Sequence, residues 1–271
     1  MDVKFASILV VGCGNMGGAM LTGWLAAGAD PGRFTVVDPV VGAVPAGVAL
    51  LREMPVGRAF DAVLLGVKPQ MLAEVGPSVE PAAGPQTVLL SILAGVELAT
   101  LRARFPRAGG IVRVMPNLAA ALGKSPIALV AQGLDEERKA AVDALMAPLG
   151  TPEWLAEEEA MHAVTALAGS GPAFVYRFID ALAAGGAQLG LPAEQAGRLA
   201  LAMVEGAAAL AARSEHSPGE LARRVASPGG TTQAGLDALD RDDALARLIE
   251  ATLSAARARS AEMAAETRTK G

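Results

Sequence analysis

The chain has 271 residues, of which 52% are hydrophobic but only 3% aromatic, and its formal net charge is −5. This length predicts two domains around large cores built from small aliphatic side chains. The acidic balance excludes the basic footprint of a nucleic-acid-binding protein, and no uncharged apolar run reaches the roughly 18 residues of a membrane span.

The cysteine and histidine counts and the start of the first apolar run bear on the cellular compartment and on metal binding. The single cysteine, Cys13, cannot form an internal disulfide, which is typical of a protein in the reducing cytoplasm. The first apolar run begins within a few residues of the N-terminus, so we expect no signal peptide. The two histidines, His162 and His216, are far apart in sequence, and we therefore predict no metal site.

The first predicted element is a buried strand, Ile8–Val11, followed by a glycine-rich turn and a helical pattern from Met16 to Ala27. The turn has the dinucleotide-binding spacing, in which Gly12 permits a tight turn, Gly14 admits the pyrophosphate, and Gly17 allows close packing of helix on strand. The helix N-terminus then offers free N–H donors to phosphate. We predict a nucleotide cofactor here, a purely structural tight turn being the alternative.

A second strand is predicted over residues 33–38 and ends at Asp38. An acid at this position hydrogen-bonds the adenosine ribose and repels a 2′-phosphate. No Arg or Lys occurs from Pro39 to Gly47 to offset that repulsion, so the pattern favours NADH. The alternative is that Asp38 only begins a turn with Pro39. We expect Val40 to Gly57 to be irregular, with at most a short helix.

Further strands are predicted over 61–67, 87–92, 111–115 and 126–131, with a helix over 135–149. Lys68 follows the first of these strands, at the edge where parallel sheets bind ligands, and Pro69 suits the first position of a helix. The alternation of strands and helices predicts a doubly wound, mainly parallel sheet. We assign residues 1–156 to this dinucleotide-binding domain.

Residues 157–271 carry helical periodicity and no convincing strand. Ser170-Gly171-Pro172 marks a helix start, and an apolar face recurs from Phe174 to Leu189. In the next predicted helix, residues 193–213, Glu205 is the only charge between Leu199 and Ala212. A helix that is apolar nearly all round must be covered on several sides, which predicts an interlocked homodimer through this domain.

The loop Ser227-Pro228-Gly229-Gly230-Thr231-Thr232 precedes the last predicted helix, which runs from about Ala234 to Arg259 before a frayed tail. Its glycines, hydroxyls and helix-start N–H groups suit a small carboxylate. An ordinary helix cap is the alternative.

Taken together, these landmarks resemble pyrroline-5-carboxylate reductase, the family of the last step of proline biosynthesis. The resemblance spans nearly the whole chain and rests on these segments, in this order: Gly12-Cys13-Gly14-Asn15-Met16-Gly17, Val67-Lys68-Pro69, Met115-Pro116-Asn117, Gly169-Ser170-Gly171-Pro172 and Ser227-Pro228-Gly229-Gly230-Thr231-Thr232. At Asp38 the chain departs from many relatives, which have a small polar or phosphate-binding residue there; this bears on NADP preference and not on the reaction.

The resemblance implies a Rossmann domain, a helical dimerisation domain, dimers assembled into a higher oligomer, and reduction of 1-pyrroline-5-carboxylate to L-proline with NADH or NADPH. The residues expected at the cofactor are Gly12, Cys13, Gly14, Asn15, Met16, Gly17, Asp38, Val67, Lys68, Pro69, Ala94 and Asn117. Those expected at the substrate are Glu158, Ser227, Gly229, Gly230, Thr231 and Thr232, with Thr232 as the catalytic residue close to the ring nitrogen.

Two other functions share the predicted architecture. A β-hydroxyacid dehydrogenase needs a lysine and an asparagine on its long helix, and no lysine occurs between Lys139 and Lys270. A nucleotide-binding Rossmann protein without turnover is the second.

Overall fold

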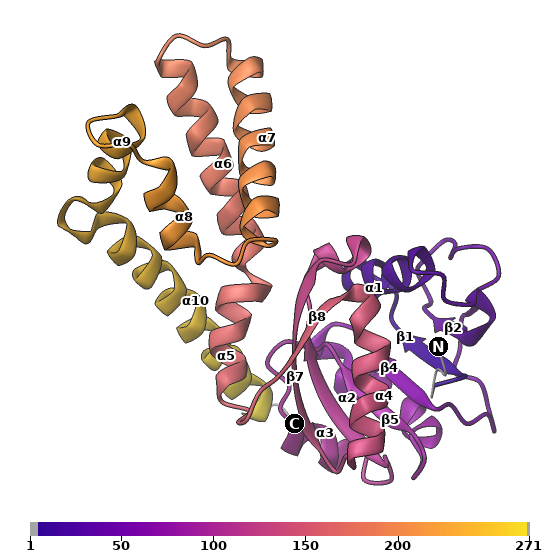
Figure 1. Ribbon diagram of the computed structural model, residues 1–271. Coiled ribbons are helices and arrows are strands. Elements are labelled where there is room, and N and C mark those ends of the chain that lie inside the picture. The colour runs from indigo at the N-terminus through magenta and orange to yellow at the C-terminus, as the bar shows by residue number, and fades with distance from the viewer. Residues whose placement is uncertain (1–4, 270–271) are drawn as a thin grey trace. The chain divides into compact units, whose positions relative to one another are not determined.

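The computed structural model describes residues 5–269 and is shown in Figure 1. Contacts divide the chain into two units. The first comprises the chain up to Gly169 together with the chain from Ala256 onward, and the second is Ser170–Ala255. This division falls later than the predicted boundary at 156/157, and it groups the end of the last helix with the sheet. The assignment of residues 157–271 to one substrate-binding and dimerisation domain stays a prediction.

The first unit is built on an eight-stranded sheet of order β3-β2-β1-β4-β5-β6-β7-β8. Its strands are β1 (Ile8–Val11), β2 (Phe34–Val37), β3 (Ala49–Leu51), β4 (Ala62–Leu65), β5 (Val88–Ser91), β6 (Gly110–Met115), β7 (Ser125–Gln132) and β8 (Gly150–Trp154). Neighbouring strands run parallel except β6 and β7, which are antiparallel. The predicted mainly parallel, doubly wound sheet is confirmed.

Helices cover both faces of this sheet and bury two separate cores. One core joins α1 (Asn15–Ala26) and α4 (Glu136–Met146) to the sheet, and the other joins α2 (Leu72–Val79), α3 (Leu98–Arg104) and α5 (Ala160–Val164) to the opposite face. Strand β1 serves both, because successive side chains alternate between faces: Ile8 and Val10 enter the first core, and Leu9 and Val11 the second. Each fully buried aliphatic side chain stabilises the fold by about 1.5–3 kcal/mol.

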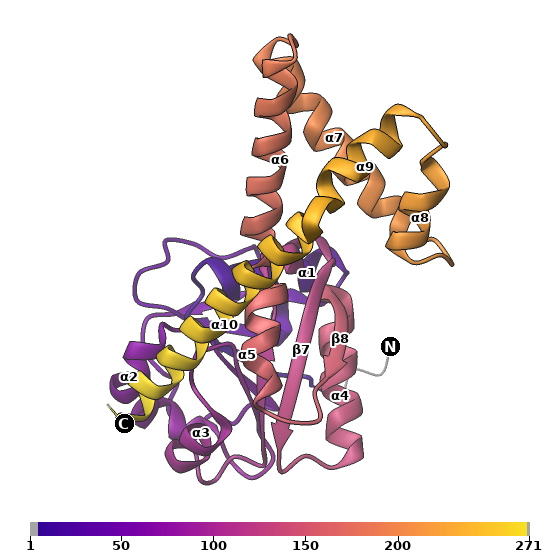
Figure 2. The ribbon, with the colours of Figure 1, turned by 90° about the vertical axis from the view of Figure 1, so that its left-hand side faces the viewer.

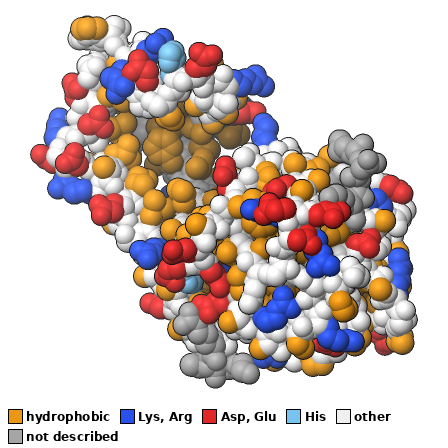
Figure 3. All heavy atoms as spheres, turned by 60° about the horizontal axis from the view of Figure 1, so that its bottom comes forward, with side chains coloured by type: hydrophobic (Ala, Val, Ile, Leu, Met, Phe, Trp, Pro, Cys, Tyr) orange, Lys and Arg blue, Asp and Glu red, His pale blue; other side chains and the backbone are white. Residues whose placement is uncertain are grey.

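The second unit is helical throughout. It contains α6 (Gly171–Gln188), α7 (Ala193–Ala211), α8 (Pro218–Val225), α9 (Thr231–Asp240) and the first part of α10 (Ala244–Thr269). Large apolar side chains on its helices stay accessible in the single chain, among them Phe178 at 47%, Leu199 at 52% and Leu210 at 65% exposure. Hydrophobic side chains gather on the face of this unit seen in Figure 3. No described helix is both long and apolar enough to cross a membrane.

The structure corrects four expectations about individual elements. The segment expected to be irregular contains β3, and β8 follows α4 where no strand was predicted. The single last helix predicted from Ala234 is two helices, because Asp242 and Asp243 take positive φ angles of 53° and 55° and interrupt it. Helix α10 also continues to Thr269 rather than fraying after Arg259.

Candidate functional site

The glycine turn after β1 has the geometry that its spacing predicts. Gly12 has a φ of +88°, and a Cβ there would lie 2.8 Å from the backbone of Gly66 and Val67. A Cβ on Gly17 would lie 2.6 Å from the Gly12 carbonyl oxygen, so α1 packs closely on the turn. Nothing lies within 4 Å of the Cβ position of Gly14, the residue that must admit a phosphate. The turn therefore leaves open the one position that a dinucleotide needs.

The N-terminus of α1 adds donors beside that open position. Helix α1 begins at Asn15, and no side chain caps it, so the N–H groups of its first turn, including Met16, lack intrahelical acceptors. They lie at the positive end of the helix dipole, which favours a phosphate. The residues that could hold a dinucleotide here line a cleft of about 650 Å³ that includes Gly12, Gly14, Asp38, Val67 and Lys68.

The carboxylate of Asp38 lies at the carboxyl end of β2 and is bonded to the backbone around it. One oxygen accepts from the Cys13 N–H at 2.8 Å, and the other accepts from Val40 at 2.8 Å and Val41 at 2.9 Å. Burial opposes ionisation, but these three N–H groups and the charge of Arg52 outweigh it and hold the pKa of Asp38 below its ordinary value. Asp38 thus shapes the turn as the alternative interpretation proposed, and as a side chain of the cleft it has acceptor capacity left on the Cys13-bonded oxygen.

Arg52 is the basic residue of the cleft lining that was not predicted from the sequence. Counting basic residues only from Pro39 to Gly47 gave none, but β3 pairs with β2 and brings Arg52, the residue after β3, into the cleft lining. Its Nη1 donates to the carbonyl oxygens of Asp38 at 2.8 Å and Val41 at 2.6 Å. The expectation of no basic residue near Asp38 is therefore wrong; recognising β3 as a partner of β2 would have found it.

Cys13 is buried in the turn, with 8% of its surface exposed. Burial, and after it the negative charge of Asp38, raises the pKa of the Cys13 thiol. A thiol kept protonated is a poor nucleophile, so the burial of this side chain and the direction of its pKa shift favour a packing function in the turn.

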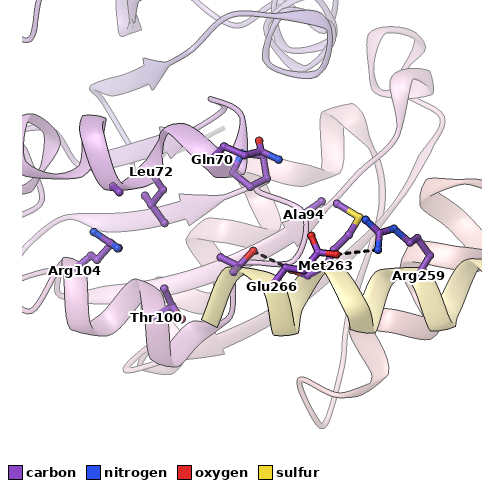
Figure 4. Close-up of a pocket in the computed structure, with 11 residues that line it drawn as sticks. Gln70, Leu72, Ala94, Thr100, Arg104, Arg259, Met263 and Glu266 are labelled. Carbon is purple, nitrogen blue, oxygen red and sulfur yellow. Dashed lines mark hydrogen bonds and ion pairs between the residues drawn. The ribbon is translucent and has the colours of Figure 1, made fainter. Parts of the chain in front are cut away.

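Pro69 and Ala94 line a neighbouring pocket rather than the cleft. Pro69 begins the 3₁₀ turn Pro69–Met71 that leads into α2, as predicted. With Gln70, Ala94 and Met263 of α10 it lines a pocket of about 260 Å³, shown in Figure 4. Across the pocket wall Arg259 and Glu266 form an ion pair of 3.0 Å. The end of α10 thus lies against the loop that follows β5.

Asn117, at the end of β6, is 8% exposed and bonded within the protein. Its side-chain oxygen accepts from Ala119 at 3.0 Å, and its amide nitrogen donates to Ala168 at 3.0 Å. It caps the 3₁₀ turn Leu118–Leu122. The predicted contact of Asn117 with the cofactor stays a prediction. The hydrogen bonds shown give the side chain a structural function of its own.

The Glu158 carboxylate is also hydrogen-bonded to other residues of the first unit. Its Oε1 accepts from Nη1 of Arg113 at 2.6 Å and from the N–H of Leu98, at the start of α3, at 2.8 Å. The Arg113 side chain is only 5% exposed, so the ion pair neutralises a buried charge whose isolation would be costly. The predicted contact of Glu158 with substrate stays a prediction, and the bonds shown give it a separate structural function.

The loop before α9 presents unused polar groups. Gly229 has a φ of +70°, and the Gly230 N–H donates to the Ser227 carbonyl at 2.9 Å, which folds the loop into a turn. No side chain caps α9, whose N-cap is Gly230. Thr231 and Thr232, which carry hydroxyl groups, are exposed residues. No side chain caps this described helix start, and its free N–H groups can donate to a carboxylate.

Among residues 5–269 no group of three or more His, Cys, Asp or Glu side chains is placed to hold a metal ion. His162 is buried instead, with its Nδ1 2.9 Å from the Ser260 hydroxyl of α10. Figure 2 shows the end of α10 running beside α5, which carries His162.

Comparisons with known proteins cover nearly the whole chain. The family model described as pyrroline-5-carboxylate reductase dimerisation matches residues 158–263. Pyrroline-5-carboxylate reductase of Pseudomonas aeruginosa is 36% identical over 265 residues, which are 95% of this chain and 96% of that protein.

Solved structures agree. A pyrroline-5-carboxylate reductase from Coxiella burnetii is 30% identical with a TM-score of 0.88, covering 95% of this chain and 98% of that one. The Plasmodium falciparum pyrroline carboxylate reductase, solved with NADP bound, has a TM-score of 0.82 over 97% of this chain and 99% of its own; at 24% identity it shows the shared fold.

Proposed function

This chain belongs to the pyrroline-5-carboxylate reductase family, and from that membership we propose that it reduces the C=N bond of 1-pyrroline-5-carboxylate to L-proline with NAD(P)H. The observation that carries the proposal is the open glycine turn at the carboxyl edge of the sheet, with uncapped α1 behind it. Gly12, Gly14 and Gly17 with the first turn of α1 form what we call the dinucleotide cradle. The relatives of this chain are named for the proposed reaction.

The residues of the cradle fit a dinucleotide by shape and by charge. Gly12 cannot be replaced by a residue with a Cβ, Gly14 leaves space for a phosphate, and the first turn of α1 supplies N–H donors. Bound NAD(P)H supplies the hydride. The chain supplies the orientation, since holding two reactants in one geometry removes much of the entropic cost of their meeting.

The loop Ser227–Thr232 is the proposed substrate site. The uncapped N-terminus of α9 binds the substrate carboxylate through backbone N–H groups. The Thr232 hydroxyl hydrogen-bonds the ring nitrogen and, as an aliphatic alcohol is a weak acid, passes a proton only together with water. A protonated imine already accepts hydride readily, which explains why the reaction needs no acid–base dyad.

For cofactor preference we propose that NADH is used at least as well as NADPH. The ionised Asp38 carboxylate lines the cleft and repels a 2′-phosphate while accepting a ribose hydroxyl.

For assembly we propose that the exposed apolar helices of the second unit, α6 and α7, pair with those of a second copy, and that dimers build a higher oligomer. Side chains such as Leu199 and Leu210, more than half exposed in the single chain, are an unusual cost in water unless a partner covers them. The single free thiol, buried Cys13, agrees with a cytoplasmic location, which we also propose.

The decisive test is oxidation of NADH and NADPH by the purified protein with 1-pyrroline-5-carboxylate, with L-proline measured as product. Stoichiometric proline formation is expected. Oxidation of a β-hydroxyacid with NAD⁺ or NADP⁺, without reduction of the imine, would assign the chain to the dehydrogenase alternative. Cofactor binding without turnover of either substrate would make it a binding protein.

A further inference from the structure

Arg52 lines the cleft next to Asp38, to whose carbonyl oxygen it is hydrogen-bonded. Neither the family membership nor the proposed function gives this cation a role. We propose that Arg52 binds the 2′-phosphate of NADPH, so that the enzyme uses both cofactors although Asp38 favours NADH. The inference rests on the proposed dinucleotide site and names the residue that sets its selectivity.

The position of Arg52 follows from strand order. Strand β3 pairs in parallel with β2, with Val37 opposite Leu51. Their carboxyl ends therefore lie together, and Arg52 follows β3 just as Asp38 follows β2. In dinucleotide folds the acid after the second strand lies at the ribose 2′-hydroxyl. A cation bonded to that residue's own carbonyl oxygen is next to the place where a 2′-phosphate would lie.

The guanidinium is held in a way that leaves one edge available. Both hydrogens of Nη1 are used, by the carbonyl oxygens of Asp38 and Val41 at 2.8 and 2.6 Å. Within the described chain, Nε and Nη2 of Arg52 donate to no protein acceptor, and together they form the two-donor edge that matches phosphate oxygens. Because the side chain is already tethered, less conformational entropy is lost when the phosphate binds.

The other cation of the cleft is less suited to this function. Lys68 follows β4, and β1 lies between β4 and β2 in the sheet. Two strand spacings place it about 10 Å from the end of β2. Asp38 also repels a phosphate less than an unbonded carboxylate would, since three backbone N–H groups already share its charge.

The test compares ADP-ribose with its 2′-phosphorylated derivative, which differ only in the phosphate, by titration calorimetry. Loss of a charge-assisted hydrogen bond commonly lowers binding affinity about tenfold or more. Arg52→Ala should therefore lower the affinity for the phosphorylated ligand by about that factor or more, and leave the affinity for ADP-ribose within about twofold of the wild-type value. Arg52→Lys keeps the charge without the two-donor edge and should fall between. Raising the salt concentration should reduce the affinity difference between the two ligands more in the wild type than in Arg52→Ala.

Arg58→Ala is the matched control. Arg58 is an exposed arginine in the same connection to β4, but it lies over the Phe60 ring, 4.7 Å from its centroid, and is not among the cleft-lining residues. It should leave both ligands unaffected. Equal losses of both ligands in Arg52→Ala, or no loss of either, would overturn the inference.

These outcomes are separate from the proposed reaction, because binding is measured without substrate. A protein that binds both ligands as expected but does not reduce the imine would retain the inference and lose the proposed function. One that reduces the imine while Arg52→Ala leaves its discrimination unchanged would lose the inference alone.

Discussion

The candidate site residues are of two kinds. Some are accessible to a ligand, and others are already hydrogen-bonded within the protein. Thr232 and the backbone at Gly14 are open, since the first is exposed and the second has free space above it. Asn117 and Glu158 are bonded to neighbouring backbone or to Arg113. A sequence pattern identifies both kinds equally well, because the type of residue does not reveal which partner it finds in the fold.

Thr232→Val keeps the side-chain volume and removes the hydroxyl. If that hydroxyl bonds the ring nitrogen and is buried by the bound substrate, kcat/KM for 1-pyrroline-5-carboxylate should fall by the equivalent of about 1–3 kcal/mol, the cost of leaving a polar group unpaired in the complex. Steady-state kinetics measure this, and cofactor affinity is the internal control because the proposed dinucleotide site belongs to the other unit. Thr232→Ser should restore most of the activity. Wild-type kinetics in Thr232→Val would mean that the hydroxyl has no function in the reaction.

Asp38 gives a pH-dependent prediction for stability. Its pKa is lower in the folded protein than its ordinary value, so its contribution is complete above the unfolded pKa of about 3.9 and is lost as the pH falls through the folded value. Asp38→Asn keeps the shape but loses the acceptor for the Cys13 N–H. The variant should therefore be less stable than wild type at pH 7, and the gap should close in acid. Urea unfolding at pH 7 and near pH 3 measures both gaps; equal gaps would contradict the prediction.

At the scale of elements, the strongly patterned segments were predictable and the short edge elements were not. Four-residue apolar strands such as β1 and β4 are buried throughout, and their composition alone indicates a parallel sheet. Strand β3 has three residues, and β8 contains Gly150 and Pro152 with alternate residues exposed. Their pairing comes from the neighbouring strand rather than from their own propensity.

The missed elements explain the missed parts of the site. Because β3 was expected to be irregular, Arg52 was not placed beside Asp38. The break between α9 and α10 was missed for a related reason: the run Asp240-Arg241-Asp242-Asp243 is compatible with an exposed helix, and only aspartate's tolerance of positive φ permits the turn that forms there.

The contact between α10 and the β5–α3 loop is testable with a pair of glycines. Gly95 has a φ of +74°, and a Cβ there would lie 3.2 Å from the Met263 carbonyl carbon and 3.3 Å from the Ala264 nitrogen. Gly28 has a φ of +88° but free space around its Cβ position. Gly28→Ala should cost about 1–2 kcal/mol for the left-handed conformation, and Gly95→Ala about 1–3 kcal/mol more because the α10 backbone must shift.

Denaturant unfolding measures the difference. Equal losses for the two variants would mean that α10 is not packed tightly on this loop. If Ala94 contacts the cofactor as the family resemblance implies, Gly95→Ala should also weaken NADH affinity, while Gly28→Ala should leave it unchanged.

At the scale of the whole molecule, the proposed cofactor cleft and the proposed substrate loop belong to different units of the chain. The apolar helices of the second unit are left accessible to a second copy. An interlocked dimer would bury those helices and bring the Ser227–Thr232 loop of one protomer to the cofactor cleft of its partner. The two halves of each active site would then come from two chains.

Sharing of this kind predicts recovery of activity in mixed dimers. Gly14→Asp places a side chain and a negative charge in the open phosphate position, and Thr232→Val disables the substrate loop, so each homodimer should be weakly active. If each site combines the turn of one protomer with the loop of the other, a mixed dimer contains one site with both lesions and one with neither. Co-expression with two different affinity tags isolates the mixed dimer, whose activity should clearly exceed that of both parents. Purified mixed dimers without such recovery would show that each chain builds its complete site from its own two units.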